Sequence, residues 1–265
     1  MGTIIRIKGV TFTNPNLPVV QSPYKGVTDG LIAHYQPHLR DALIQPVAGT
    51  EVAATKVGSP SYASAYIRGA KGAGVNSNVV VAGGGITEYT ICGVFRRPAG
   101  VTGAAQALSV GNTGASAIGF TDNGIRVWAY GTPTGGSSTV VTWSDPHFAA
   151  LDPLVDPDHW EFVALTCGSS MSTAYVPRVG WSNYRNTISG DYFGQGGGTI
   201  SSPGASTYMG KIAYDNLNGT NPETGAAVDV AYGTFFGKVL SADEVQQQYE
   251  AAAGYCSSMG IEFGA

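Results

Sequence analysis

The sequence predicts an all-β protein: an antiparallel β-sandwich of the jelly-roll type, with an extended N-terminal arm and a short C-terminal helix. Short apolar segments that alternate with period two recur along the chain. Clusters of Gly, Asn, Asp and Ser separate these segments without intervening amphipathic helices, which is typical of antiparallel sheets. Because 265 residues suit a single sandwich, residues 27–265 are predicted to form one domain behind an arm over residues 1–26.

The arm is predicted to begin with a half-exposed strand over residues 3–8. The stretch that follows, NPNLPVVQSPYKG, cannot continue a strand ladder because proline lacks the amide donor. Asp122-Asn123-Gly124 tolerates positive φ and predicts a tight hairpin between adjacent antiparallel strands. The further predicted strands cover residues 30–35, 78–82, 88–96, 105–110, 117–120, 124–130, 138–143, 160–167, 172–177, 207–213 and 228–236.

The C-terminal helix has a strong local signal. Ser241 and Glu244 form the sequence pattern of a capping box, and Leu240 and Val245 occupy the positions of a hydrophobic staple. Gly254 is placed to end the helix with a left-handed residue. The residues predicted to share the face that docks on the sandwich are Ala242, Val245, Tyr249 and Ala252.

Composition excludes several classes of function. Charged residues make up 12% of the chain against about 25% in typical proteins, and the net charge is −4 without a cluster of Lys and Arg. Nucleic acid is therefore not an expected partner. The sequence contains neither a signal-peptide pattern nor an apolar run of about 20 residues, which predicts synthesis in the cytoplasm without membrane insertion. The three cysteines form no metal-binding spacing, and Cys92 and Cys167 are predicted to be buried thiols.

Several segments together resemble the concanavalin A-like (laminin-G-like) jelly rolls, especially modules of bacteriophage and bacterial surface proteins. GLIAHYQP at residues 30–37 is similar to the entry strand of that family, and EYTICGVFRRP at 88–98 to its central strand. HWEFVALTCGSSMSTAYVPRVG at 159–180 resembles a family hairpin, and KVLSADEV at 238–245 the closing strand and capped helix. The likeness spans residues 27–255. It departs from the family at Pro177-Arg178-Val179-Gly180, where an Asn-Gly turn is expected, and in the long segment DNLNGTNPETG.

The resemblance implies a non-enzymatic structural or adhesion module of a bacteriophage particle, located in the tail, baseplate or fibre of the virion. Residues 1–25 would attach it to other virion proteins, because an extended segment can add a strand to a partner's sheet. A symmetric homo-oligomer, with a trimer favoured, follows from the same hypothesis. Two alternatives stay open: a carbohydrate-binding module for a host receptor, and a glycan-cleaving enzyme.

Catalytic and metal-binding patterns are weak. Glycan-cleaving sites of this fold need closely spaced carboxylates, and the nearest candidates, Asp156, Asp158 and Glu161, fit a solvated loop that leads into a strand better. His34 and His38 lie on either side of Pro37, which argues for surface or interface histidines rather than a shared metal. No cofactor is therefore predicted. Calcium stays an alternative, and the oxygen-rich residues that favour it are Asp215, Asn216 and Asn218.

The aromatic loops carry the best candidate binding sites. Aromatic side chains beside amide, carboxylate or guanidinium groups suit either a glycan or a protein interface. The candidates for such contacts are Trp143, Asp145, His147, Trp181, Asn183, Tyr184, Arg185 and Tyr192. A second set lies on the face of the predicted 124–130 strand opposite the core and suits an interface with a neighbouring subunit: Arg126, Trp128 and Tyr130.

Overall fold

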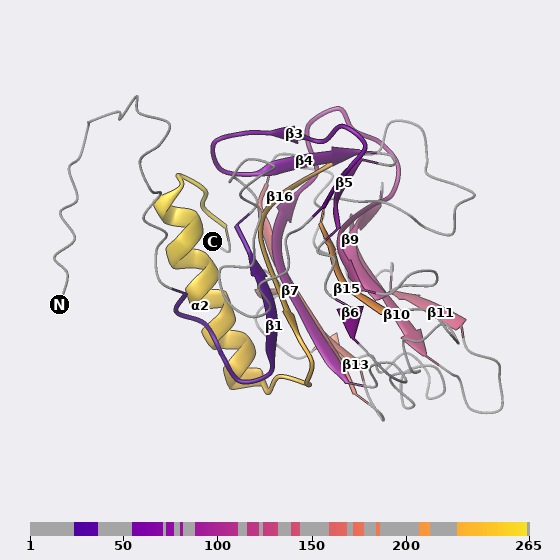
Figure 1. The fold of residues 1–265 in the computed structure, drawn as a ribbon, viewed down its shortest axis with the longest axis vertical. Helices are drawn as coiled ribbons and strands as arrows, with labels where there is room; N and C mark the ends of the chain where they lie inside the picture. Colours follow the sequence, from indigo (N-terminus) through magenta and orange to yellow (C-terminus); the bar gives the residue numbers. More distant parts are fainter. Residues whose placement is uncertain are drawn as a thin grey trace, which may run out of the picture.

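The protein is a two-sheet antiparallel sandwich with a helix on the outer side of one sheet, which confirms the predicted fold class. The computed structural model describes residues 24–36, 55–70, 73–76, 80–81, 88–110, 116–121, 124–131, 139–143, 159–168, 172–177, 184–185, 207–212 and 227–263. The predicted strand over residues 3–8 and most of the predicted arm lie outside these ranges. In Figure 1 the helix, the first sheet and the second sheet form three successive layers.

The first sheet holds the central strands of the sequence prediction. The strands run, in spatial order, β14 (Tyr184–Arg185), β13 (Ser172–Tyr175), β12 (Glu161–Cys167), β7 (Tyr89–Arg96), β16 (Ala227–Phe236), β4 (Ile67–Ala70) and β3 (Ser61–Tyr62). Strand β1 (Leu31–Tyr35) also pairs with β16. Every pairing is antiparallel.

The second sheet lies face to face with the first. Its spatial order is β11 (Thr139–Trp143), β10 (Gly124–Gly131), β9 (Ser116–Thr121), β8 (Ala105–Val110), β15 (Thr207–Ile212), β5 (Gly74–Asn76) and β2 (Thr55–Val57), and β6 (Val80–Val81) pairs with β15. Gly124 pairs with Thr121, so β9 and β10 are the adjacent antiparallel strands that the Asp-Asn-Gly turn predicted. The sequence prediction missed β2, β3, β4, β5 and β14, whose two to four residues are too short to show an alternation.

The main core fills the space between the sheets, and glycines shape part of it. Leu108 of β8 is fully buried and projects toward Gly93 of β7 and Gly233 of β16, which are register partners. A Cβ on either glycine would crowd the methyl groups of Leu108. The two glycines therefore let a leucine of the opposite sheet pack directly against the backbone of the first sheet.

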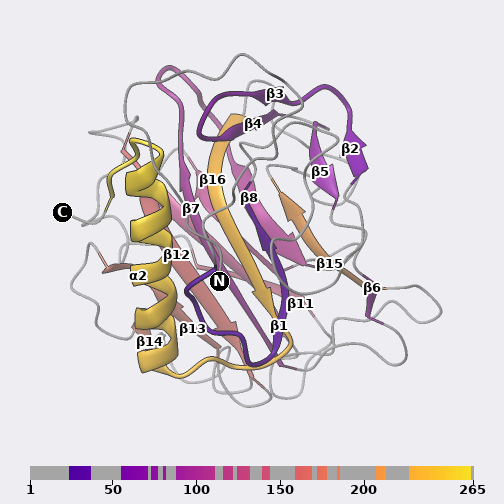
Figure 2. The ribbon, with the colours of Figure 1, turned by 60° about the vertical axis from the view of Figure 1, so that its left-hand side comes forward.

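Helix α2 (Ala242–Ser258) lies against the outer side of the first sheet (Figure 2). A second apolar cluster fills the space between them. Ser241 and Glu244 form the predicted capping box, and Leu240 and Val245 are both buried in this cluster. Cys92 and Cys167 are buried free thiols, as predicted. Burial raises the pKa of the Cys92 thiol to about 12.

Two predictions about the helix are wrong. Gly254 does not end it, because the helix continues to Ser258 and the left-handed residue is Gly260, with φ of 77°. Ala242 is exposed rather than docked. Those helix residues that are buried are Val245, Gln248, Ala252, Tyr255 and Cys256. The buried face thus includes a glutamine, for which the sequence supplied no signal.

Candidate functional site: a pocket between the helix and the first strand

The predicted aromatic sites can be placed only in part. Trp143 ends β11, and Tyr184 and Arg185 form β14, so each segment lies at the edge of its sheet among the strands that the structure describes. Strand β12 of the first sheet contacts β9 of the second, and β4 contacts β5, so the two strand orders run in the same direction. The β14 edge of the first sheet and the β11 edge of the second therefore lie at the same end of the sandwich. The candidates outside the described residues are Asp145, His147, Trp181, Asn183, Tyr192, Asp215, Asn216 and Asn218.

The predicted interface strand is internal to its sheet. The backbone of β10, which carries Arg126, Trp128 and Tyr130, is paired with β9 on one side and β11 on the other. The side chains of these residues are outside the described part of the structure. Their role in an interface therefore stays a prediction.

A pocket that the sequence did not predict lies where β1 and β16 meet helix α2. Its volume is about 280 Å³, and its walls come from the segment before β1, from both strands and from the helix. The lining residues are Tyr24, Lys25, His34, Gln36, Tyr232, Gln247, Glu250, Ala251, Gly254 and Tyr255. His34, Gln36, Tyr232 and Tyr255 are buried and form the floor, while Lys25, Gln247, Glu250 and Gly254 are exposed at the rim.

Strand β1 and the residue that follows it place His34 and Gln36 in the pocket, because side chains alternate along this segment. Ala33 and Tyr35 of this strand belong to the core between the sheets. Because successive side chains of a strand point to opposite faces, His34 and Gln36 point toward the helix. The interpretation of His34 as a surface or interface histidine is therefore wrong: only 1% of its surface is exposed. The available sequence signal was two polar residues at i and i+2 on one face of an apolar strand.

Aromatic rings line the pocket in a continuous series. The ring centroids of Tyr24 and His34 are 4.6 Å apart, those of His34 and Tyr232 are 4.8 Å apart, and those of Tyr232 and Tyr255 are 5.9 Å apart. The three tyrosines come from three different elements of the structure. An aromatic floor of this kind presents both flat apolar faces and polar ring edges to whatever occupies the pocket.

The buried amide of Gln248 joins two of these tyrosines. The Tyr232 hydroxyl donates to Gln248 Oε1 at 3.3 Å, and Gln248 Nε2 donates to the Tyr24 hydroxyl at 2.7 Å. The Tyr24 hydroxyl in turn donates to the carbonyl oxygen of Val27 at 2.8 Å. Gly26 leaves room for this network, because a Cβ there would overlap the Gln248 amide and the Tyr24 hydroxyl. Burial raises the pKa of Tyr24 and of Tyr232 above its ordinary value.

His34 is the one member of the ring series whose polar atoms have no hydrogen bond within the described structure. Neither Nδ1 nor Nε2 has a partner, although both are buried. Burial lowers the pKa of the His34 imidazole to about 3, because the surroundings disfavour the charged form. At neutral pH the floor of the pocket therefore carries an uncharged ring with one donor nitrogen and one acceptor nitrogen.

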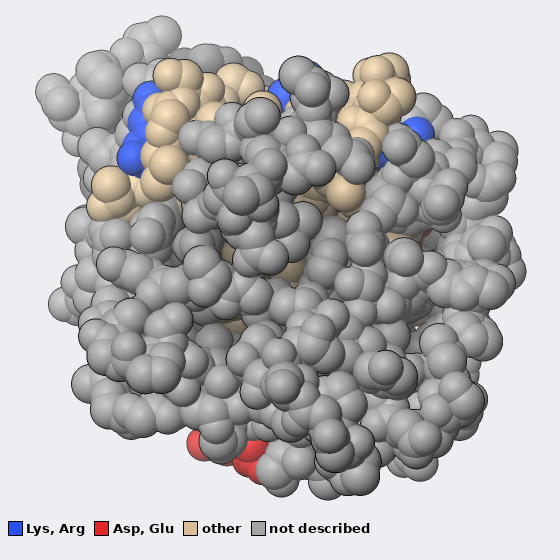
Figure 3. Space-filling view, turned by 90° about the vertical axis from the view of Figure 1, so that its right-hand side faces the viewer, with Lys and Arg blue, Asp and Glu red and all other residues tan. Residues whose placement is uncertain are grey.

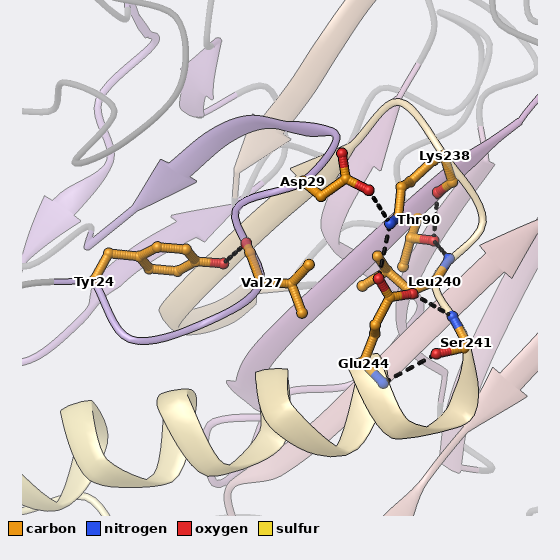
Figure 4. A network of polar contacts seen from close by, with 8 residues as sticks. All are labelled: Tyr24, Val27, Asp29, Thr90, Lys238, Leu240, Ser241 and Glu244. Carbon is orange, nitrogen blue, oxygen red and sulfur yellow. Dashed lines mark hydrogen bonds and ion pairs between the residues drawn. The ribbon is translucent and has the colours of Figure 1, made fainter.

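The segment that carries Tyr24 is fixed to the start of the helix, as Figure 4 shows. Lys238 Nζ lies 2.5 Å from Asp29 Oδ2 and 2.7 Å from Glu244 Oε1, so one ammonium group ties the turn before β1 to the first turn of α2. Thr90 Oγ1 donates to the Lys238 carbonyl oxygen and accepts from the Leu240 amide. Two walls of the pocket are thus held by contacts outside it.

A helical glycine lies at the rim. Gly254 is in the interior of α2, where glycine is about 0.5–1 kcal/mol less favourable than alanine. A Cβ at this position would meet no atom within 4 Å, so packing does not require the glycine. A side chain there would instead project from the edge of the pocket.

A charged cluster lies elsewhere on the outer side of the first sheet. The fully buried carboxylate of Asp229 accepts from Arg68 Nε at 2.6 Å and Nη2 at 2.8 Å, and from Arg96 Nε at 2.9 Å. The Arg96 guanidinium carbon lies 5.0 Å from the Tyr66 ring centroid and 4.7 Å from that of Trp160. This cluster links β4, β7 and β16 through ionic contacts that converge on one buried carboxylate.

The two carboxylates that the structure describes in the first sheet, Glu161 and Asp229, do not form a pair suited to glycan cleavage. Asp156 and Asp158 lie outside the described residues. Glu161 lies in β12, within the predicted strand over residues 160–167, and is buried, and Asp229 accepts hydrogen bonds from two guanidinium groups. Acid–base cleavage needs two carboxyl groups that reach the same bond of a substrate. Both Glu161 and Asp229 are buried, so neither exposes its carboxyl group to a substrate.

The described part of the chain can be assessed for a metal site and for a membrane-spanning helix. It contains no group of three or more His, Cys, Asp or Glu side chains arranged to hold a metal ion. Within the same residues, no helix has the length and apolar character needed to cross a lipid bilayer. Figure 3 views the molecule from the side of the second sheet, where the described Lys and Arg lie along the upper rim and the described Asp and Glu at the lower end.

The fold is similar to solved binding domains of toxins and to a sialidase. No protein-family model and no curated protein matches the sequence. The binding domain of Paraclostridial Mosquitocidal Protein 1 is 12% identical with a TM-score of 0.55, over 86% of this chain and 53% of that chain. A mutant Trypanosoma rangeli sialidase displaying trans-sialidase activity is 11% identical with a TM-score of 0.54, over 89% and 34% of the two chains.

A third similar structure was solved with a sugar. The ligand-binding domain of botulinum neurotoxin serotype D, in complex with N-acetylneuraminic acid, is 9% identical with a TM-score of 0.50, over 84% of this chain and 51% of that chain. The chain therefore spans about half the length of these toxin chains and about a third of the sialidase. At these identities the likeness establishes a β-sandwich fold and nothing about the ligand.

Proposed function

We propose that this protein is a non-catalytic carbohydrate-binding module that holds a small glycan in the pocket between α2 and β1. The observation that carries the proposal is the composition of the pocket: tyrosine rings, an unpaired imidazole and amide side chains converge on a space of about 280 Å³. An aromatic surface combined with a few fixed polar groups is the typical lining of a small-molecule binding site. The binding of N-acetylneuraminic acid by a toxin domain of similar fold adds a precedent for sugar recognition on this architecture.

The size and shape of the site also suit a sugar. Its volume lies near the lower end of the range of about 300–1,000 Å³ for small-molecule sites, which favours a mono- or disaccharide unit. Sugar rings have apolar C–H faces that pack on tyrosines and hydroxyl groups that bond to amides and carboxylates. Gln36 on the floor and Gln247 and Glu250 at the rim supply such partners.

The phage-particle role inferred from the sequence stays a separate hypothesis. It depends on attachment through residues 1–25, of which the structure describes only Tyr24 and Lys25. A glycan-binding pocket is compatible with an adhesion module of a virion, and equally with a module of a secreted or surface protein. Trimer formation and virion partners belong to the same hypothesis.

A glycan array followed by calorimetric titration tests the proposal. The labelled protein is expected to bind at least one glycan, and Gly254→Trp is expected to abolish that binding because an indole at the rim would cover the pocket. Ser257→Trp is the matched control, since Ser257 is exposed on the same helix and does not line the pocket. An array without any binder above background would reject the function, and equal binding by both variants would move the site elsewhere.

A further inference from the structure

The imidazole of His34 is buried without a hydrogen-bond partner among the described residues, an arrangement that packing of the fold does not require. A buried imidazole normally finds at least one hydrogen-bond partner, because leaving a buried polar group unsatisfied costs about 1–3 kcal/mol. Both ring nitrogens of His34 lack such a partner, and the ring is 1% exposed. An apolar ring in this place would keep the contacts with Tyr24 and Tyr232 without that cost.

The polar groups of the neighbouring Tyr24, Tyr232 and Gln248 form hydrogen bonds that do not involve His34. The Tyr232 hydroxyl donates to Gln248, the Gln248 amide donates to Tyr24, and Tyr24 donates to the Val27 carbonyl. This network runs beside His34 and does not include it. The imidazole is therefore positioned by the rings on either side of it while its hydrogen-bonding capacity remains unused.

The charges around the pocket limit the kind of ligand that can reach the floor. The floor residues His34, Gln36, Tyr232 and Tyr255 carry no charge at neutral pH, because the imidazole is neutral and burial raises the tyrosine pKa values. The charged lining residues, Lys25 and Glu250, are exposed at the rim and have opposite signs. A ligand carboxylate on the floor would be buried without a cation, which is costly.

We propose that His34 is the specificity-determining residue of this pocket, and that it selects an uncharged sugar by hydrogen-bonding one of its hydroxyl groups. The inference rests on the proposed carbohydrate-binding function and deepens it. A neutral imidazole can pair with a hydroxyl either as donor or as acceptor, so the bond satisfies a group that the fold leaves unpaired. A neutral hexose or N-acetylhexosamine is therefore preferred over an acidic sugar, although a domain of similar fold has been solved with an acidic one.

The test uses nitrogen NMR on the full chain labelled with ¹⁵N-histidine. The probes are methyl glucoside, methyl galactoside and N-acetylglucosamine as neutral sugars, with N-acetylneuraminic acid as the acidic one. At least one neutral sugar is expected to shift the His34 ring nitrogens in a saturable way, and N-acetylneuraminic acid is expected to bind at least about 10-fold more weakly. Preferred binding of the acidic sugar in the pocket would overturn the inference.

Variants separate this inference from the proposed function. His34→Phe keeps an aromatic ring between Tyr24 and Tyr232 and is expected to weaken neutral-sugar binding by about 10-fold, the effect of one lost hydrogen bond in a buried site. His34→Gln, which keeps a donor and an acceptor, is expected to retain more affinity than His34→Phe. If Gly254→Trp blocks sugar binding while His34→Phe and the wild-type ring nitrogens are unaffected, the function stands and His34 is not the selector. If no sugar binds the wild type, both proposals fail.

Discussion

The two sides of the first sheet differ in what they bury. The inner side, which faces the second sheet, packs an apolar cluster that includes Leu108, Phe95 and Phe235. The outer side, which faces α2, also buries apolar residues but mixes them with Asp229, His34 and Gln248. Apolar packing needs only complementary shape, whereas each polar group on the outer side needs a defined partner. The inner layer therefore supports the fold, and the outer layer contains the groups that can recognise something.

The largest expected effect is at the charged cluster of the outer layer. Asp229→Ala is expected to lower the free energy of unfolding by about 3–5 kcal/mol, because it leaves two guanidinium groups without their buried carboxylate. Urea denaturation followed by circular dichroism measures the change. Glu88→Ala, at an exposed position, is the control and should change stability by less than about 0.5 kcal/mol. Equal stability of the two variants would mean that the cluster does not hold β4, β7 and β16 together.

The inner layer should respond to loss of volume instead. Leu108→Ala is expected to cost about 3 kcal/mol, because neighbouring Gly93 and Gly233 have no side chains that could fill the cavity. Val239→Ala is the matched control, since that side chain is 37% exposed. Sugar affinity measured at a temperature where Leu108→Ala is folded should equal that of the wild type. A loss of affinity would contradict the separation of the two layers.

The pocket histidine should make stability depend on pH. The pKa of His34 is about 3 in the folded protein and near 6.5 in the unfolded chain, so below pH 6.5 the unfolded state takes up a proton that the folded state does not. The contribution of the neutral His34 to the free energy of unfolding is complete above pH 6.5 and is lost as the pH falls toward 3. At pH 5 the wild type should therefore have lost about 2 kcal/mol relative to pH 7.5 through this residue.

His34→Phe isolates that contribution, because all other titrating groups are shared with the wild type. The variant is expected to lose about 2 kcal/mol less than the wild type between pH 7.5 and pH 5 in urea titrations. Lys25 and Glu250 at the rim and the tyrosines Tyr24, Tyr232 and Tyr255 are present in both proteins. Identical losses in the two proteins would show that His34 is protonated in the folded state.

The smallest expected effect concerns one glycine within the helix and one that follows its C-terminal end. Gly254→Ala should stabilise the protein by about 0.5–1 kcal/mol, because the position is helical and the added methyl group meets no atom. Gly260→Ala should instead destabilise it, by about 1 kcal/mol, because its φ is 77°. Thermal denaturation of the two variants should therefore shift the midpoint in opposite directions. If both variants shifted the midpoint in the same direction, Gly260 would not be the residue that caps the helix.

The sequence predicted the elements of the fold better than it predicted the site. Strands of five residues or more agree with the structure to within one or two residues, since alternation over that length is a strong local signal. The short strands of residues 55–76 escaped prediction because their pairing comes from the neighbouring strands. The pocket escaped because its walls come from Tyr24, β1, β16 and α2, whose proximity no local pattern reveals.

The sequence by itself determined where the strands alternate, where the turn between β9 and β10 lies and where the helix begins, because those signals act between residues a few positions apart. Only the tertiary structure decided which polar residues are buried. Gln248 joins Tyr24 across 224 positions of sequence, and Asp229 meets Arg68 across 161. Burial changes the energy of a polar group through partners that arrive from distant segments, so the neutral imidazole of His34 and the pocket around it exist only once the layers have packed.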